Sequence, residues 1–340
     1  MKFKAFLVTE IGDSLDRSIV EKNLDDLPDH DTLIKVSYSS LNYKDALSAN
    51  GNRGVTKVYP HTPGIDAAGV IVESKNPELK PGTEVIVTGY DFGMNTSGGY
   101  QEFVKVPSEW VVPLPKNMTL KESMIYGTAG LTAAISVYKL IVKGEIKPED
   151  GEILVTGATG GVGSVAVKIL SKLGYEVVGV TGKAEESEFL LNIGAKRVIK
   201  RAEADDHSRP ILKGIYAGVI DTVGGNILST GIKSLKYNGV ATTCGNVAGA
   251  SFESSVYPFI IRGVTLYGVD SVQISTSERE LLWNKLSTDW KIDDLDKLST
   301  EITLEDLNDK IELILKGRNK GRVVVKLWKK SCIWLVRYQK

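Results

Sequence analysis

The 340-residue sequence has few of the side chains that hold metals, with two cysteines and three histidines. A catalytic zinc needs about three Cys, His or carboxylate ligands, and a structural zinc about four cysteines. His30, His61, His207, Cys244 and Cys332 supply neither set, so we predict a protein without metal. We expect the isolated histidines on the surface or in loops.

The sequence also lacks an excess of either charge, because Lys plus Arg and Asp plus Glu each number 42. No global field then attracts nucleic acid or an anionic membrane, and any phosphate binding must be local. No apolar run approaches the roughly 20 residues that span a bilayer. The first ten residues, MKFKAFLVTE, lack the pattern of a secretory signal. We expect no nucleic-acid partner, no membrane association and a cytoplasmic location.

The length predicts about two domains. Residues 1–125 carry short strand-like segments between Gly, Pro, Asn and Asp, which indicates a mostly antiparallel, barrel-like domain. Its strand candidates are 5–8, 32–36, 68–72, 84–87 and 102–106. Apolar residues at helical spacing over 122–143 lead into a second domain, residues 126–265.

Strands and helices alternate in this second domain, which predicts a doubly wound parallel sheet in an α/β fold. Its six strand candidates are 153–156, 176–180, 197–199, 218–221, 240–244 and 264–268. We expect residues 266–327, with helices near 278–289 and 304–317 and a strand at 323–325, to return to the first domain. The last residues, 328–340, are predicted to be an extension outside the fold.

The most specific local pattern is a strand at 153–156, a glycine turn through Gly160, Gly161, Val162 and Gly163, and a helix. The tight turn requires residues without a Cβ, and a pyrophosphate must approach the backbone N–H groups at the helix start closely. The next strand follows Gly174 and completes a β–α–β unit. We predict dinucleotide binding; the alternative is a purely structural glycine-rich turn.

The end of that next strand indicates which dinucleotide is bound. NAD-specific sites usually carry a carboxylate there for the ribose 2′-hydroxyl, and this chain has Thr181, Gly182 and Lys183. A hydroxyl and an ammonium suit a 2′-phosphate, so we predict NADPH. The alternative is that Lys183 simply begins a solvated helix.

The sequence resembles the acrylyl-CoA reductase family, within the quinone oxidoreductase branch of the zinc-free medium-chain dehydrogenases/reductases. Zinc-containing relatives have Gly-His-Glu where this chain has Gly64-Ile65-Asp66, and a cysteine ligand near Asn42. The resemblance extends to about residue 327. The matching motifs are Ser40-Leu41-Asn42-Tyr43-Lys44-Asp45, Pro63-Gly64-Ile65-Asp66, Gly98-Gly99-Tyr100, Gly127-Thr128-Ala129-Gly130, residues 157–163, Asp221-Thr222-Val223-Gly224-Gly225, Cys244-Gly245, Pro258-Phe259-Ile260-Ile261-Arg262 and Gly268-Val269-Asp270-Ser271.

The resemblance implies a Rossmann domain beside a GroES-like barrel, a homodimer, and NADPH-dependent reduction of acrylyl-CoA to propionyl-CoA. It also implies cofactor contacts from Tyr43, the Gly160 to Gly163 turn, Thr181 to Lys183 and Arg201. Further implied contacts, at the nicotinamide end, are Asn246, Ile260, Ser271 and Arg322. Thr181 and Lys183 replace the more usual Ser and Arg, and Asn246 stands in a commonly aliphatic segment.

Hydride addition to an activated alkene leaves negative charge on the carbonyl oxygen and requires a proton at the α-carbon. Asn42 is a candidate donor, and Tyr43 a candidate proton relay that alternatively only packs on the nicotinamide. Asp45 and Asp66, in the same motifs, are interpreted as buried carboxylates bonded to backbone N–H groups. We interpret Cys244 as a packing residue and the basic loop 50–57 as solvated, the alternative being that it reaches the phosphates of CoA.

Two other functions remain open. One is a general NADPH-dependent quinone or enone reductase, which needs no CoA contacts. The other is an NADPH-binding protein without turnover, and the absence of a basic or aromatic stripe argues against nucleic acid as its partner. Strand pairing by residues 264–267 across a two-fold axis is a hypothesis for the dimer.

Overall fold

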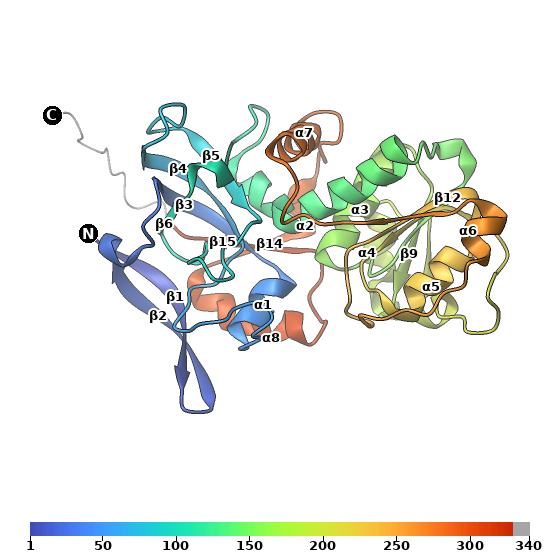
Figure 1. The fold of residues 1–340 in the computed structure, drawn as a ribbon, viewed down its shortest axis with the longest axis horizontal. Helices are drawn as coiled ribbons and strands as arrows, with labels where there is room; N and C mark the ends of the chain where they lie inside the picture. Colours follow the sequence, from blue (N-terminus) through green and yellow to red (C-terminus); the bar gives the residue numbers. More distant parts are fainter. Residues whose placement is uncertain (329–340) are drawn as a thin grey trace.

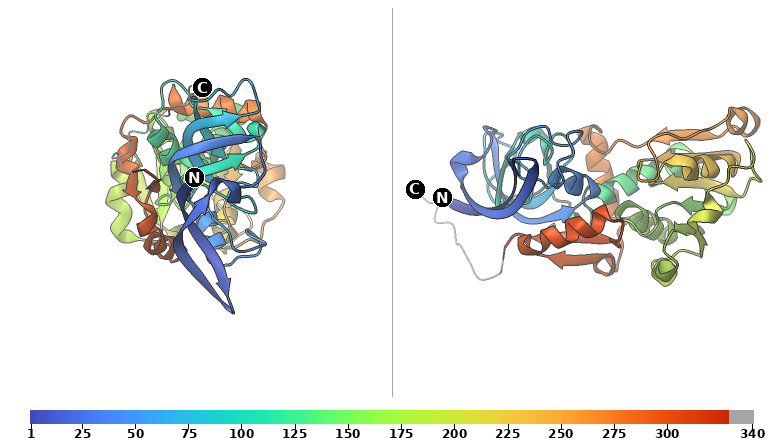
Figure 2. Two further views of the ribbon diagram at one scale, coloured as in Figure 1. Left: turned by 90° about the vertical axis from the view of Figure 1, so that its left-hand side faces the viewer. Right: turned by 90° about the horizontal axis from the view of Figure 1, so that it is seen from below.

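The computed structural model describes residues 1–328, which form two bodies side by side along the long axis (Figure 1, Figure 2). One body is built on a six-stranded parallel sheet and the other on a seven-stranded, mostly antiparallel sheet. Helix α2 (Leu120–Tyr138) lies between them and packs against both α3 (Gly161–Lys172) and β4 (Asp66–Ser74). The predicted fold class, a doubly wound sheet beside a mostly β barrel-like domain, is confirmed.

The parallel sheet has the strand order β10-β9-β8-β11-β12-β13, which is that of a Rossmann fold. Its strands read as nearly continuous apolar runs because helices cover both faces. In this order a ligand crevice lies at the carboxyl ends of β8 and β11, where the winding reverses. The strands are β8 (Glu152–Val155), β9 (Val177–Thr181), β10 (Arg197–Lys200), β11 (Tyr216–Asp221), β12 (Leu235–Thr243) and β13 (Thr265–Gly268). All six lie at the predicted places.

The second sheet has the order β14-β15-β3-β4-β5-β7, with β6 also pairing with β3. Its strands are β3 (Thr32–Leu41), β4, β5 (Glu84–Thr88), β6 (Phe103–Val106), β7 (Val111–Pro113), β14 (Ser299–Ile302) and β15 (Arg322–Lys326). Strand β15 pairs antiparallel with β3, with Val323 opposite Leu41. This register places Arg322 beside the segment that follows β3. The pairing thus connects a strand near the end of the chain to one near its beginning.

Strands β1 (Lys2–Ile11) and β2 (Ser14–Asn23) form a separate hairpin that projects from the barrel (Figure 2). The sequence prediction missed β2, β7 and β14. Strand β2, SLDRSIVEKN, contributes no fully buried side chain, so it lacks the apolar alternation that identifies a strand. The remaining helices are α1 (Tyr43–Ala49), α4 (Ser187–Asn192), α5 (Gly225–Lys233), α6 (Tyr257–Arg262), α7 (Thr276–Ser287) and α8 (Leu307–Leu315).

Two expectations need correction. Residues Leu120–Lys143, which are α2 and a π-helical turn, are long and apolar enough to span a membrane, but 72% of their most apolar window is buried in the protein. Trp328, predicted to begin an extension outside the fold, packs edge-on against Phe103, and the Lys35 ammonium lies 3.8 Å from the centre of its ring. The rest of that predicted extension, residues 329–340, lies outside the described residues.

Candidate functional site

The glycine turn between β8 and α3 fits a pyrophosphate. Gly157 has φ 55°, and a Cβ on Gly163 would lie 2.4 Å from the carbonyl oxygen of Gly157, so a side chain would distort the turn. No side chain caps α3 at Gly160. The first N–H groups of this helix, those of Gly161, Val162 and Gly163, are therefore available to an anion at the positive end of the helix dipole.

The carboxyl end of β9 gathers cationic groups. A Cβ on Gly182 would lie 3.1 Å from the central guanidinium carbon of Arg201, so the guanidinium packs over this glycine. The backbone N–H of Lys183 donates to Oγ1 of Thr181 (3.1 Å), which turns the chain at the strand end. The structure thus brings Thr181, Gly182, Lys183 and Arg201 together, with no carboxylate among residues 181–183.

A buried polar network occupies the barrel next to α1, and it consists of Ser40, Asn42, Asp45, Asp66, Tyr100, Thr128 and Arg322. The Asp66 carboxylate accepts hydrogen bonds from Asn42 Nδ2 (2.7 Å) and from the backbone N–H of Thr128 (2.9 Å). Asp45 accepts from the N–H groups of Asn42 and Ile65, each at 2.8 Å. These contacts support the interpretation of both aspartates as structural carboxylates.

Within this network, Asp45 is expected to make stability depend on pH. Burial and the like charge of Asp66 raise the pKa of Asp45 from 3.8 to about 7. Between these pKa values the folded chain retains a proton that the unfolded chain releases, so raising the pH lowers the free energy of unfolding, by about 1.4 kcal/mol per pH unit for one proton. Denaturant unfolding at pH 5, 6, 7 and 8 should show this loss, and Asp45→Asn should flatten it. Equal slopes for the two proteins would contradict the assignment.

Asn42 begins α1 as its N-cap, and its side chain faces the network instead of the solvent. The amide donates to Asp66, and its oxygen accepts from Arg322 Nη1 (3.2 Å). The amide hydrogens point at protein acceptors, so Asn42 holds the start of α1 in this structure, and its donor role toward a substrate stays a prediction. Tyr43, the next residue, is 37% exposed, and its hydroxyl has no hydrogen-bond partner among residues 1–328.

Arg322 links the start of α1 to the glycine turn. Its Nε donates to the backbone oxygen of Ile125 (2.8 Å) and its Nη2 to Ser40 Oγ (2.9 Å). Nη1 lies 2.9 Å from the position that a Cβ on Gly161 would take. The side chain is 2% exposed, and burial lowers its pKa while the charge of Asp66 opposes that shift. Arg322 therefore lies beneath the turn and is already bonded to protein acceptors.

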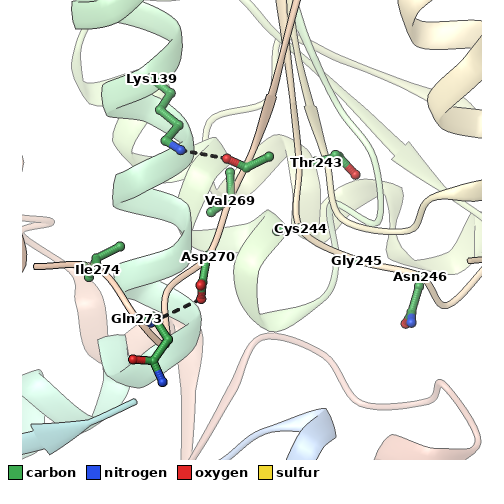
Figure 3. Close-up of a pocket in the computed structure, with 10 residues that line it drawn as sticks. Lys139, Thr243, Cys244, Gly245, Asn246, Val269, Asp270, Gln273 and Ile274 are labelled. Atoms are coloured by element: carbon green, nitrogen blue, oxygen red, sulfur yellow. Dashed lines mark hydrogen bonds between the residues drawn. The ribbon is translucent and has the colours of Figure 1, made fainter. Parts of the chain in front are cut away.

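An open cleft of about 740 Å³ lies between α2 and the carboxyl ends of β12 and β13 (Figure 3). Its lining includes Asn246 and Asp270, from two of the segments predicted to contact the nicotinamide end. Ser271 follows Asp270, and its hydroxyl lies 2.9 Å from Thr132 Oγ1 of α2, a contact the sequence did not indicate. Burial raises the pKa of the Cys244 thiol in this lining to about 12, which agrees with packing rather than reactivity.

Ile260 lies apart from the other candidates. It is 71% exposed on α6, and α6 lies at the outer end of the Rossmann body, away from the barrel (Figure 1). Its contact with the cofactor is not supported within a single chain.

Among the histidines, His61 is buried rather than exposed, with Nε2 3.0 Å from the carbonyl oxygen of Gly93. Over residues 1–328, no three Cys, His, Asp or Glu side chains gather as a metal site would require.

A GroES-like barrel joined to a Rossmann sheet, with a glycine turn at the switch point, defines a medium-chain dehydrogenase/reductase. Residues 28–116 match the family model described as alcohol dehydrogenase GroES-like domain, and residues 161–287 match the one described as zinc-binding dehydrogenase.

Individual relatives identify the family within the medium-chain dehydrogenases/reductases to which the chain belongs. The chain is 42% identical to the putative quinone oxidoreductase YhfP of Bacillus subtilis over 96% of this chain and 99% of that one. It is 40% identical to the acrylyl-CoA reductase AcuI of Ruegeria pomeroyi over 91% and 93% of the two chains. The structure of the Salmonella enterica yhdH oxidoreductase in complex with NADP superposes with a TM-score of 0.93 at 38% identity, covering 96% of this chain and all of that one. The chain belongs to the acrylyl-CoA reductase family of the zinc-free medium-chain dehydrogenases/reductases.

Proposed function

We propose that this chain reduces the carbon–carbon double bond of acrylyl-CoA to give propionyl-CoA, with NADPH as hydride donor and without a metal. The observation that carries the cofactor choice is the pair of cations, Lys183 and Arg201, at the carboxyl end of β9 beside an uncapped glycine turn. The substrate choice is supported by the relationship to the acrylyl-CoA reductase of Ruegeria pomeroyi.

The proposed cofactor contacts extend from the adenosine end to the nicotinamide end. The N–H groups of Gly161 to Gly163 would hold the pyrophosphate, and Lys183 with Arg201 would hold the 2′-phosphate. Asn246 and Ser271 would lie along the nicotinamide end. When bound, NADPH supplies the hydride that the β-carbon of the alkene accepts.

The protein's own side chains must supply the proton that completes the reduction. As the β-carbon gains the hydride, negative charge spreads to the thioester oxygen and the α-carbon must gain a proton. Tyr43 is the proposed relay, because it is 37% exposed at the start of α1 and its hydroxyl has no hydrogen-bond partner among residues 1–328. Asn42 positions Tyr43 by holding the start of that helix in the buried polar network.

Tyr43→Phe tests the relay. We expect the variant to lower kcat about 100-fold, which is the usual size of a general acid–base contribution, with the KM for NADPH changed little. Steady-state kinetics from pH 6 to 9 would measure it, with Tyr38→Phe, a partly buried tyrosine of β3, as a matched control. An unchanged kcat for Tyr43→Phe would assign Tyr43 to packing only.

The function itself is tested by NADPH absorbance at saturating acrylyl-CoA, with NADH and a simple quinone as parallel reactions on chelator-treated protein. Preferred oxidation of NADPH by acrylyl-CoA is the expected result. Oxidation by quinones alone would replace the proposal with a quinone reductase, the activity named for the Bacillus relative. NADPH binding without turnover would leave a cofactor-binding protein. In loop 50–57, Arg53 is bonded to Glu10 and to the carbonyl oxygen of Lys57, which favours a solvated loop over a contact between Arg53 and CoA.

The proposal includes a cytoplasmic homodimer. Strand β13 is an edge strand, paired only with β12 among the described residues, and α6 beside it exposes Tyr257, Ile260 and Ile261. An open edge and an apolar surface favour strand pairing with a second copy. Sedimentation at micromolar concentration should give twice the chain mass of 37.0 kDa, and Ile260→Glu should shift it toward monomer. Monomer alone in the unaltered protein would reject the dimer.

A further inference from the structure

Arg279, on α7, is a fully buried arginine to which the proposed mechanism gives no role. No carboxylate lies within ion-pair distance of its guanidinium among residues 1–328; its acceptors are oxygens of neutral groups. Nη1 donates to the backbone oxygen of Thr88 (2.8 Å) and to Thr88 Oγ1 (3.0 Å), and Nη2 donates to the backbone oxygen of Val272 (3.1 Å). A buried cation without a counter-ion is expensive, and burial lowers the pKa of Arg279.

These acceptors belong to two different bodies of the protein. Thr88 ends β5 in the barrel sheet, and Val272 lies in the loop 269–274 that follows β13 of the Rossmann sheet. The backbone supports the same junction, since the N–H of Tyr90 also donates to the Val272 oxygen (3.1 Å). A Cβ on Gly89 would lie 2.9 Å from Nη2, so a glycine is needed for the guanidinium to come this close. Arg279 thus pins the loop to the barrel.

The pinned loop forms one wall of the cleft in Figure 3. Val269, Asp270, Gln273 and Ile274 line that cleft, and Asp270 Oδ1 accepts from the Val272 N–H (2.8 Å). A series of hydrogen bonds connects the loop to the interior of the protein. The Ser271 hydroxyl is hydrogen-bonded to Thr132 Oγ1, and Thr132 Oγ1 donates to the carbonyl oxygen of Thr128 (2.7 Å).

Thr128 Oγ1 donates in turn to Asp66 (2.6 Å), and Asp66 holds Asn42 at the start of α1. One chain of contacts therefore runs from Arg279 to the residue before Tyr43.

We propose that Arg279 is a positioning residue: by holding loop 269–274 against the barrel, it fixes the nicotinamide end of the bound cofactor relative to Tyr43. This inference rests on the proposed function for the identity of the cofactor. The adenosine end is held elsewhere, by the glycine turn, Lys183 and Arg201. Loss of the clamp, which is the set of hydrogen bonds from Arg279 to Thr88 and Val272, should therefore weaken binding of the nicotinamide end and leave binding of the adenosine end unchanged. A general loss of folding would weaken both.

Arg279→Lys is the first test, because lysine keeps the charge but cannot reach acceptors on both sides with one ammonium. The affinity for 2′,5′-ADP, which carries only the adenosine end, should stay within about 2-fold of that of the unaltered protein. The affinity for NADPH should fall about 10-fold, and turnover should fall about 100-fold, as expected for a misplacement near 1 Å. The fluorescence of bound NADPH should also lose the enhancement that an immobilised nicotinamide gives.

Thr88→Val is a milder second variant that removes one acceptor and should show the same pattern to a smaller degree. Trp283→Phe is the matched control: Trp283 is equally buried one turn further along α7, and its Nε1 has no acceptor among the described residues, so this change alters core packing without removing a hydrogen bond of the clamp. Turnover of Arg279→Lys within 2-fold of that of the unaltered protein would overturn the inference. An equal loss of affinity for 2′,5′-ADP and NADPH, as for a merely unstable protein, would also overturn it.

Binding of both ligands to the unaltered protein, measured without any substrate, tests the proposed cofactor separately. Failure there would reject the proposed function itself.

Discussion

Replacing both Lys183 and Arg201 with alanine should lower kcat/KM for NADPH on the order of 10³-fold, because each charge-assisted contact to a phosphate contributes about 1.5–3 kcal/mol. The ribose of NADH carries a hydroxyl in place of the phosphate, so kcat/KM for NADH should change less than about 3-fold. Preference between the two cofactors would then nearly vanish. Steady-state kinetics with each cofactor at a fixed substrate concentration would measure both values.

Lys196→Ala is the matched control for this double variant. Lys196 precedes β10, and its ammonium forms an exposed ion pair with Glu176 (2.7 Å), at the end of the strands opposite Thr181. The Lys196→Ala variant removes a positive charge from the same sheet without touching the predicted phosphate site. If the double variant kept its NADPH preference, or if Lys196→Ala lost it equally, the 2′-phosphate would bind elsewhere.

Arg322→Met should destabilise the protein by about 3–5 kcal/mol and lower the midpoint of thermal unfolding on the order of 10 °C. Methionine fills a similar volume but donates no hydrogen bond. Asp66 would lose its nearest buried cation, and the carbonyl oxygen of Ile125 its donor. Arg322 joins β15 to the segment after β3. We therefore expect the lost stability to come from the contacts by which β15, near the end of the chain, closes the barrel.

Lys326→Met provides the comparison on the same strand. Lys326 pairs with Glu301 at 3.4 Å, and both side chains are partly exposed, so its removal should cost less than about 1 kcal/mol. Thermal unfolding followed by circular dichroism would compare the two. Equal midpoints for Arg322→Met and the unaltered protein would show that the buried polar network contributes little to stability.

The Rossmann half was largely predictable because its signals are local. Each parallel strand is a short apolar run, and Gly157, Gly160, Gly161 and Gly163 stand where a strand turns into a helix. The proximity of Arg201 to Gly182 was not predictable from a local pattern, because each residue follows one of two neighbouring strands; the family resemblance implied only that both contact the cofactor.

The parts that depend on long-range contacts were not predictable. Arg279 lies in the sequence Thr-Ser-Glu-Arg-Glu, which is typical of an exposed helix start, and it is buried by long-range contacts, the packing of α7 on α2 and the bonds to Thr88 and Val272. The inward orientation of the Asn42 amide depends on Arg322, 280 residues away. Ile260 was placed by resemblance at the nicotinamide end, whereas its helix, α6, lies at the end of the Rossmann body that is away from the barrel (Figure 1).

The central claim is hydride transfer from NADPH to the β-carbon of a CoA thioester, and the fate of a labelled hydrogen tests it most directly. The protein would be given acrylyl-CoA and NADPH carrying deuterium at the transferred position of the nicotinamide ring, in ordinary water. We predict propionyl-CoA with one deuterium on the β-carbon and none on the α-carbon, whose new hydrogen comes from the solvent, as located by NMR. A thioester product without deuterium, or unreacted acrylyl-CoA beside a quinone that is reduced under the same conditions, would contradict the account.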